Sequence, residues 1–140
     1  MKSRILIATL PVLVSVALLA GCGGGGDAEA GSPTPFSIQP SSLTATAPAG
    51  SAAGVCAAGY VGDVFVYGGS APYRLNNTAP DAILLHRSAT DFTPISEVSD
   101  RGGNFSVTFT HGICLKPATV MVVDRLDHQI VLTLNNQPAS

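Results

Sequence analysis

The sequence predicts an all-β domain, a sandwich of short antiparallel strands, and three observations lead to this prediction. Residues 104–110 alternate apolar and polar side chains, which is the two-residue period of a strand with one buried face. Runs rich in β-branched residues recur along the chain, and glycine, proline and aspartate separate them. No stretch after residue 35 has the period of an amphipathic helix. Short strands at this spacing are typical of two sheets packed around one core.

The first residues are expected to be a secretory signal rather than part of the domain. Lys2 and Arg4 precede an uncharged and largely apolar run over residues 5–20, which is the order found in signal peptides. The run is shorter than the roughly 20 residues that a membrane-spanning helix needs, and Pro11 interrupts it. We therefore expect residues 1–21 to be removed from the mature protein.

The end of this run, Leu19-Ala20-Gly21-Cys22, resembles the lipobox of bacterial lipoproteins, in which an aliphatic residue and two small residues precede a cysteine. The resemblance implies that Cys22 begins the mature chain and carries lipid, and two or more acyl chains anchor a protein stably. Because Gly23 rather than aspartate follows, the expected location is the bacterial cell envelope, at the outer membrane. The alternative is an ordinary signal peptide followed by an unmodified cysteine.

The lipobox resemblance also bears on the other two of the three cysteines. If lipid occupies Cys22, then Cys56 and Cys114 remain as a pair in an oxidising compartment, where a disulfide is expected. Two buried free thiols are the alternative.

A flexible tether is expected to follow, so that residues 22–35 join the acylated Cys22 to the domain. The sequence after the cysteine, GGGGDAEAGSPTP, has no large apolar residue with which to build a core. Removal of Lys2 and Arg4 with the signal leaves 5 basic and 9 acidic residues, a net charge of −4. A nucleic-acid-binding protein would carry a basic stripe, so no nucleic-acid partner is expected.

The domain is expected to span residues 36–135, with a C-terminal tail at 136–140. A weak strand is predicted at 43–47. Two continuous apolar runs predict strands that are buried on both faces, at 64–67 and 119–123. Further strands are predicted at 82–85, 104–110 and 130–134.

Alternation assigns the faces of two of these strands. Phe105, Val107 and Phe109 are predicted to face the core, and Ser106 to face water with its polar neighbours. The same parity places His111 at the edge of the core. The last strand is predicted to present one apolar side, formed by Ile130, Leu132 and Leu134.

The stretch VFVYGGSAPY at 64–73 resembles the "strand, Gly-Gly, Pro-Tyr" signature of bacterial Ig-like extracellular modules. Residues 37–43, 103–107 and 120–134 are similar to other strands of those modules. The resemblance implies an Ig-like antiparallel β-sandwich but no particular activity. The chain departs from antibody domains because it has no tryptophan, and Gly112 stands where a tyrosine would precede the second cysteine. A bridge between loops at one end of the sandwich is therefore as plausible as a bridge between the sheets.

No pattern for catalysis or metal binding is evident, so we expect neither an enzyme nor a cofactor or metal. His86, His111 and His128 have no paired spacing, and the sequence contains no Cys-x-x-Cys and no Gly-x-Ser-x-Gly. The segment with Asp124, Asp127 and His128 fits a polar hairpin turn, in which an aspartate side chain accepts hydrogen bonds from nearby backbone N–H groups. A weak cation site in that turn is the alternative.

Three aromatic residues next to turns, Tyr60, Tyr73 and Phe92, are candidates for binding loops, although they also suit the ends of a core. The function expected from these observations is that of a membrane-anchored, non-enzymatic envelope lipoprotein. It would contact membrane lipid through Cys22 and bind an envelope protein or glycan. An accessory docking subunit of a secretion or surface complex is the alternative, and a small hydrolase or metal-binding protein comes third.

Overall fold

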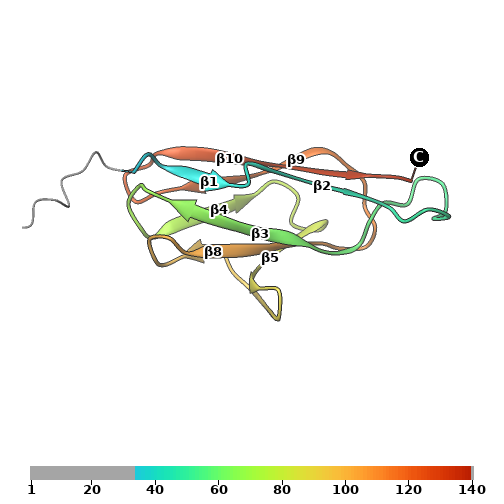
Figure 1. Ribbon diagram of the computed structural model, residues 1–140, viewed down its shortest axis with the longest axis horizontal. Helices are drawn as coiled ribbons and strands as arrows, with labels where there is room; N and C mark the ends of the chain where they lie inside the picture. The colour runs from blue at the N-terminus through green and yellow to red at the C-terminus, as the bar shows by residue number, and fades with distance from the viewer. Residues whose placement is uncertain (1–33, 140) are drawn as a thin grey trace, which may run out of the picture. The chain divides into compact units, whose positions relative to one another are not determined.

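The structure, a computed structural model, describes residues 34–139, which form two facing β-sheets and contain no helix (Figure 1). Sheet A has the strand order β1-β3-β8-β5-β6, and sheet B has the order β2-β10-β9-β4-β7. The expected signal and Cys22 lie outside the described residues. The strands are β1 (Ser37–Gln39), β2 (Ser42–Thr46), β3 (Gly59–Tyr67), β4 (Tyr73–Asn77), β5 (Ile83–Ser88), β6 (Asp91–Pro94), β7 (Glu97–Val98), β8 (Asn104–Phe109), β9 (Leu115–Val123) and β10 (Gln129–Gln137).

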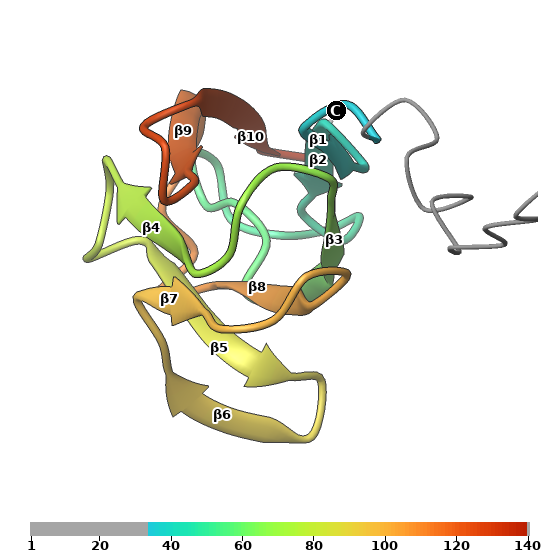
Figure 2. The same cartoon turned by 90° about the vertical axis from the view of Figure 1, so that its left-hand side faces the viewer.

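The order of the strands is that of an immunoglobulin-like sandwich, which confirms the predicted fold class. The neighbours β3, β8 and β5 correspond to strands B, E and D of that fold, and β10, β9 and β4 to strands G, F and C. The consecutive strands β1 and β2 lie at the same side of the molecule (Figure 2), yet they belong to different sheets. The strand pairs are antiparallel except β2 with β10, which is parallel, so the sandwich is not purely antiparallel.

One hydrophobic core fills the space between the sheets. Phe105, Val107 and Phe109 of β8 are at most 1% exposed, as their alternation predicts. Leu132 and Leu134 of β10 are fully buried in the same cluster from the side of sheet B. Each such side chain stabilises the fold by roughly 1.5–3 kcal/mol relative to an exposed one.

The prediction that residues 64–67 are buried on both faces is wrong. Val64 and Val66 are fully buried, but Phe65 and Tyr67 are 41% and 43% exposed. The reason is that a sandwich covers only the inner face of each sheet, so alternate residues of β3 point away from the core. The same holds in part for the run at 119–123, where Val120 is buried and its neighbours on the outer face are half-buried.

Two polar residues also differ from prediction. Ser106 was expected to face water, but it is fully buried on the outer face of sheet A, between Asp63 and His86 at the paired positions of the two neighbouring strands. Its hydroxyl donates a hydrogen bond to Asp63. His111 was expected at the edge of the core, but β8 ends before it. His111 instead lies exposed in a turn with a positive φ of 58°.

Three short strands were not predicted, namely β4, β6 and β7. In β6, the sequence Asp-Phe-Thr-Pro contains a proline, which argues against a central strand and is tolerated here because β6 is the edge of sheet A. At the other end of the chain, β10 continues to Gln137, and Asn136 is buried. Residues 136 and 137 thus belong to the sandwich rather than to a C-terminal tail.

Candidate functional site

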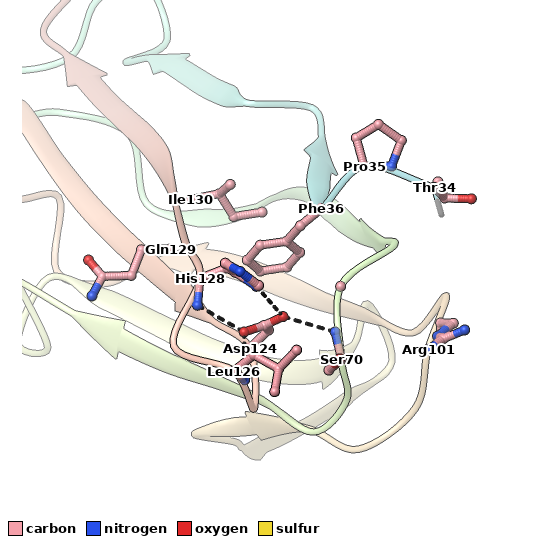
Figure 3. Close-up of a pocket in the computed structure, with 11 residues that line it drawn as sticks. Thr34, Pro35, Phe36, Ser70, Arg101, Asp124, Leu126, His128, Gln129 and Ile130 are labelled. Carbon is pink, nitrogen blue, oxygen red and sulfur yellow. Dashed lines mark hydrogen bonds and ion pairs between the residues drawn. The ribbon is translucent and has the colours of Figure 1, made fainter. Parts of the chain in front are cut away.

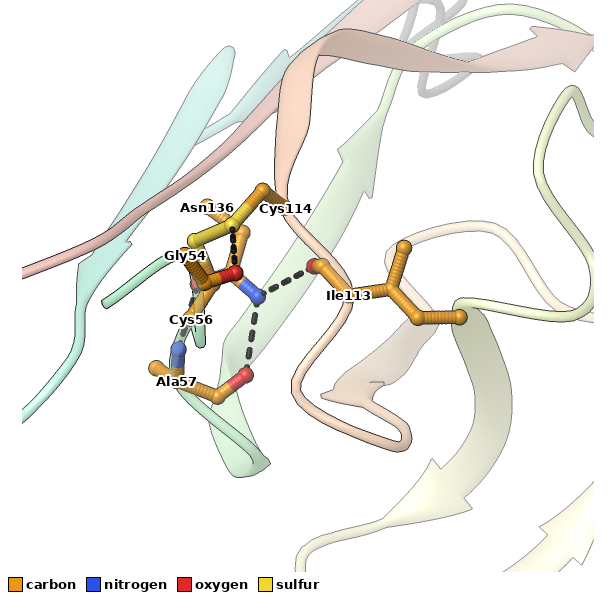
Figure 4. The surroundings of a disulfide bond; sticks show 6 residues. All are labelled: Gly54, Cys56, Ala57, Ile113, Cys114 and Asn136. Atoms are coloured by element: carbon orange, nitrogen blue, oxygen red, sulfur yellow. Dashed lines mark hydrogen bonds between the residues drawn. A yellow bond between two sulfur atoms is a disulfide. The ribbon is translucent and has the colours of Figure 1, made fainter. Parts of the chain in front are cut away.

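Cys56 and Cys114 form a disulfide, with their Cα atoms 5.1 Å apart (Figure 4). Cys56 lies in the loop between β2 and β3, and Cys114 immediately precedes β9. The bridge therefore joins two loops at one end of the sandwich. In antibody domains the disulfide instead joins the two sheets near their centres. The backbone N–H of Cys56 also donates to the carbonyl of Gly112, which holds the same two loops together.

The buried side chain of Asn136 secures this end of the sandwich as well. Its Oδ1 accepts from the N–H of Ala57 at 3.0 Å, and its Nδ2 donates to the carbonyls of Ala57 and Ile113, both at 2.8 Å (Figure 4). The amide is thus fully used within the protein. An asparagine near the end of a strand gives no sign of this role in the sequence.

Tyr73, predicted as a binding-loop residue, is instead part of the core and fully buried. Its hydroxyl donates to the carbonyl of Gly68, and its ring stacks on Phe36 with the centroids 5.7 Å apart. Gly69 makes this stacking possible, because a Cβ at that position would lie 2.7 Å from the Phe36 ring, and its φ is +61°. The glycines and the tyrosine of the Gly-Gly…Pro-Tyr signature therefore serve the packing of Tyr73 against Phe36.

Tyr60 and Phe92 do lie on the surface, 46% and 52% exposed. Both belong to strands of sheet A and flank His86, from which their ring centroids are 6.5 Å and 4.7 Å away. Phe65 and Tyr67 are exposed on the same face of sheet A, farther along β3 and beyond Asp63, where the sequence analysis expected buried residues. We call the four residues Tyr60, Phe65, Tyr67 and Phe92 the aromatic face.

His86 supports the aromatic face from below, since it is fully buried. Its Nδ1 lies 2.8 Å from the carbonyl oxygen of Ser88, which can only accept, so Nδ1 carries the hydrogen. The other ring nitrogen, Nε2, forms a hydrogen bond with the hydroxyl of Thr108 at 2.9 Å. The ring is thereby fixed in one orientation, with Phe92 stacked on it.

A carboxylate lies on the same face of sheet A as this histidine, on the other side of β8. Asp63 accepts a hydrogen bond from Ser106 and stands near the phenol of Tyr60. The pKa of Tyr60 is raised above its usual value, first by partial burial and then by the hydrogen bond and negative charge of Asp63. The shift moves the pKa of Tyr60 away from physiological pH, at which an ordinary tyrosine is already a neutral phenol.

Asp63, Ser106 and His86 occupy directly paired positions on three neighbouring strands, which the sequence alone did not bring together. Their hydrogen bonds differ from those of a catalytic triad, because Ser106 donates to Asp63 and His86 bonds to Thr108 instead of Ser106. Ser106 and His86 are also fully buried. The serine hydroxyl is thus neither hydrogen-bonded to the histidine nor exposed, as the nucleophile of such a triad is.

No metal centre forms within residues 34–139, where no three His, Cys, Asp or Glu side chains are grouped as ligands would be. Sequence analysis left a cation site open for the turn between β9 and β10. There, Oδ1 of Asp124 accepts from the N–H groups of Leu126 and His128 at 2.8 Å and 2.9 Å. Its Oδ2 accepts from the N–H of Ser70 and faces the His128 ring (Figure 3). Oδ1 therefore serves the turn, and Oδ2 ties the turn to the loop between β3 and β4. Both oxygens are used within the protein, which favours the polar-turn interpretation.

Asp124 also lines a cleft of about 640 Å³ together with Phe36, Arg101, Leu126 and His128 (Figure 3). Burial, the largest influence, raises the pKa of Asp124. The hydrogen bonds from His128, and then those from the backbone, outweigh burial and lower the pKa to about 2. The carboxylate is therefore ionised and already saturated with donors, so it is not directed at a ligand.

Comparison with protein-family models, curated proteins and solved structures finds no match to the chain. No helix capable of crossing a membrane occurs in residues 34–139. The candidate site is therefore identified from the geometry of the sandwich alone. We take the aromatic face as that site.

Proposed function

We propose that the protein is a lipid-anchored, non-enzymatic component of the bacterial cell envelope whose sandwich binds an envelope protein or glycan through the aromatic face. The observation that carries the binding role is the exposure of four of the eight aromatic residues on one face of one sheet. Aromatic side chains are enriched at binding surfaces because they bury a large area with few rotatable bonds.

The support beneath the face adds to this proposal. His86 is fixed by hydrogen bonds to Thr108 and Ser88, and it holds Phe92 in a stacked position. Phe65 and Tyr67 stand on β3, which is paired on both sides. A surface that is already ordered pays less conformational entropy on binding than a mobile loop does.

The anchoring role is supported by the sequence at Leu19-Ala20-Gly21-Cys22, which follows a complete signal-like segment. Its test is the intact mass of protein extracted from native membranes, measured with and without reductant. We expect the mass of residues 22–140 plus acyl chains, and a gain of two hydrogens on reduction of the Cys56–Cys114 bridge. An unacylated mature chain would refute the anchor.

The binding role is tested by the double variant Tyr60→Ser/Phe92→Ser in the full-length chain. Each protein is crosslinked in intact cells and purified, and the envelope material that remains attached is measured. We expect the double variant to retain less of this material than the wild type does. The matched control is Val131→Ser, which removes an exposed apolar side chain, 48% exposed, from β10 in sheet B. Equal retention by all three proteins would refute the role of the aromatic face. Recovery of a stable multi-subunit assembly would favour an accessory docking subunit.

A further inference from the structure

We propose that the partner of the aromatic face is an uncharged glycan chain, an inference that rests on the binding function proposed above. The C–H face of a β-linked sugar ring stacks on an aromatic ring, because the negatively polarised face of the ring attracts those hydrogens. Phe65 and Tyr67 supply two rings on one side of β3, since residues two apart in a strand point to the same face. Tyr60 and Phe92 supply two more, around His86.

Uncharged hydrogen-bonding groups flank the rings on β3. The strand register places Phe65 between Gln39 of β1 and Asn104 of β8, so that an amide side chain stands on each side of the ring. Tyr67 is paired with Ser37 of β1, and both Gln39 and Ser37 are exposed. Amides and hydroxyls can donate as well as accept, which matches the hydroxyl and N-acetyl groups of sugars.

The charges on this face argue against an anionic partner. Asp63 has its carboxylate bonded to Ser106, and it would repel an anionic chain. Arg87 of the β5–β6 hairpin lies 3.6 Å from the carboxylate of Asp91, so its charge is balanced locally. Anionic polysaccharides and lipid headgroups are recognised through clusters of exposed cations. The aromatic face instead carries the charge of Asp63 and the balanced Arg87–Asp91 pair, neither of which attracts an anion.

A protein partner fits the face less well than a glycan does. The cores of protein interfaces are continuous apolar patches from which serine is depleted. Here the rings of Phe65 and Tyr67 are separated from other apolar groups by Ser37, Gln39 and Asn104. Alternating rings and hydroxyl or amide groups suit a ligand whose own surface alternates between C–H faces and hydroxyl groups.

The test uses the full-length chain in detergent with uncharged probes, namely N-acetylated chitohexaose and cellohexaose by calorimetry and purified peptidoglycan sacculi by cosedimentation. Heparin is the anionic comparison. We expect binding to an uncharged probe and none to heparin. Phe65→Ala and Tyr67→Ala should each weaken binding about tenfold, the value of one stacking contact. Val131→Ala, on the opposite sheet, should leave it unchanged.

Two results would overturn the inference: no binding to any uncharged probe, or binding that Phe65→Ala and Tyr67→Ala leave unchanged. Tighter binding to heparin would overturn it as well. The proposed binding function is judged separately by retention of envelope material. If that retention depends on Tyr60 and Phe92 but is lost when the envelope material is treated with protease beforehand, the partner is a protein. The binding function then stands and the glycan inference fails. Circular dichroism of each variant establishes that the sandwich is intact.

Discussion

The rings of His86 and Phe92 are stacked with their centroids 4.7 Å apart, which joins a fully buried residue to an exposed one. The imidazole cannot turn freely, because Thr108 and Ser88 hold its two nitrogens. Phe92 lies on the edge strand β6, which has only a few paired residues of its own. His86 therefore holds Phe92 in position within the aromatic face and ties the start of β6 to β5.

We predict that His86→Leu lowers the free energy of unfolding by about 2–3 kcal/mol, because it removes two buried hydrogen bonds and leaves the Thr108 hydroxyl without this partner. Unfolding in urea measures the change. Arg87→Ala is the control next in sequence, since its exposed ion pair contributes roughly 0–1 kcal/mol. Equal losses in the two variants would contradict a supporting role for the imidazole.

The strands that were predicted correctly are those in which the burial pattern and the sequence pattern coincide. Phe105, Val107 and Phe109 alternate with polar residues, and all three are in the core. The stretch at 64–67 was misjudged because all four of its residues are apolar, so the sequence alone could not show which face of the sheet is covered. The exposed positions of Phe65 and Tyr67 follow only from the packing of the two sheets.

The candidate site was harder to predict because it depends on contacts between strands. Tyr60 and Phe92 were suggested by their positions near turns, yet Tyr73 was suggested on the same grounds and is buried. Whether such a ring is buried depends on partners such as Phe36, which lies far from Tyr73 in the sequence. Ser106 was misassigned for the same reason, because its acceptor Asp63 lies 43 residues away.

The burial of Tyr73 leads to a second prediction. Tyr73→Phe removes the hydrogen bond to the carbonyl of Gly68 and should lower the free energy of unfolding by about 1 kcal/mol. The matched control is Tyr67→Phe, which removes a hydroxyl from a half-exposed ring. Urea unfolding should show a loss in the first variant and little change in the second. Similar values in both would indicate that the Tyr73 hydroxyl does not stabilise the loop at Gly68.

Asp124 makes the stability of the fold depend on pH. In the folded protein its pKa is lowered from 3.8 to about 2, because hydrogen bonds from His128 and from the backbone outweigh the opposing effect of burial. A carboxyl whose pKa is lower in the folded state stabilises the fold above its unfolded pKa, and that contribution is lost as the pH falls through the folded value. The melting temperature should therefore fall between pH 3.8 and about 2.

The variant Asp124→Asn isolates this effect. It should melt at a lower temperature than the wild type at neutral pH. The N–H groups of Ser70 and His128 donate to the two carboxylate oxygens, and in asparagine one of these oxygens is replaced by an NH₂ group, which cannot accept. The difference should shrink as the wild-type carboxyl becomes protonated near pH 2. Asp81→Asn, at an exposed position, should keep the wild-type profile. A difference between Asp124→Asn and wild type that stays constant with pH would rule out this carboxyl as the source.

The disulfide and Asn136 hold the same two loops, so their contributions should be coupled. The bridge joins cysteines 58 residues apart, and losing it in Cys56→Ala/Cys114→Ala should lower the free energy of unfolding by about 4 kcal/mol in the chain-entropy estimate. The sandwich should persist, because the Asn136 amide still links Ala57 to Ile113. Reductant should lower the urea midpoint of the wild type and leave that of the double variant unchanged.

Asn136→Ala removes that remaining link, and we expect its cost to be larger in the variant without the disulfide than in the wild type. With the bridge intact, Cys56 and Cys114 keep the loops close together after the amide is lost, whereas without it the loops separate. A double-mutant cycle measured by urea unfolding gives the coupling, for which neighbours of this kind typically show about 0.5–3 kcal/mol. Strictly additive losses would mean that the bridge and the amide stabilise this end of the sandwich independently.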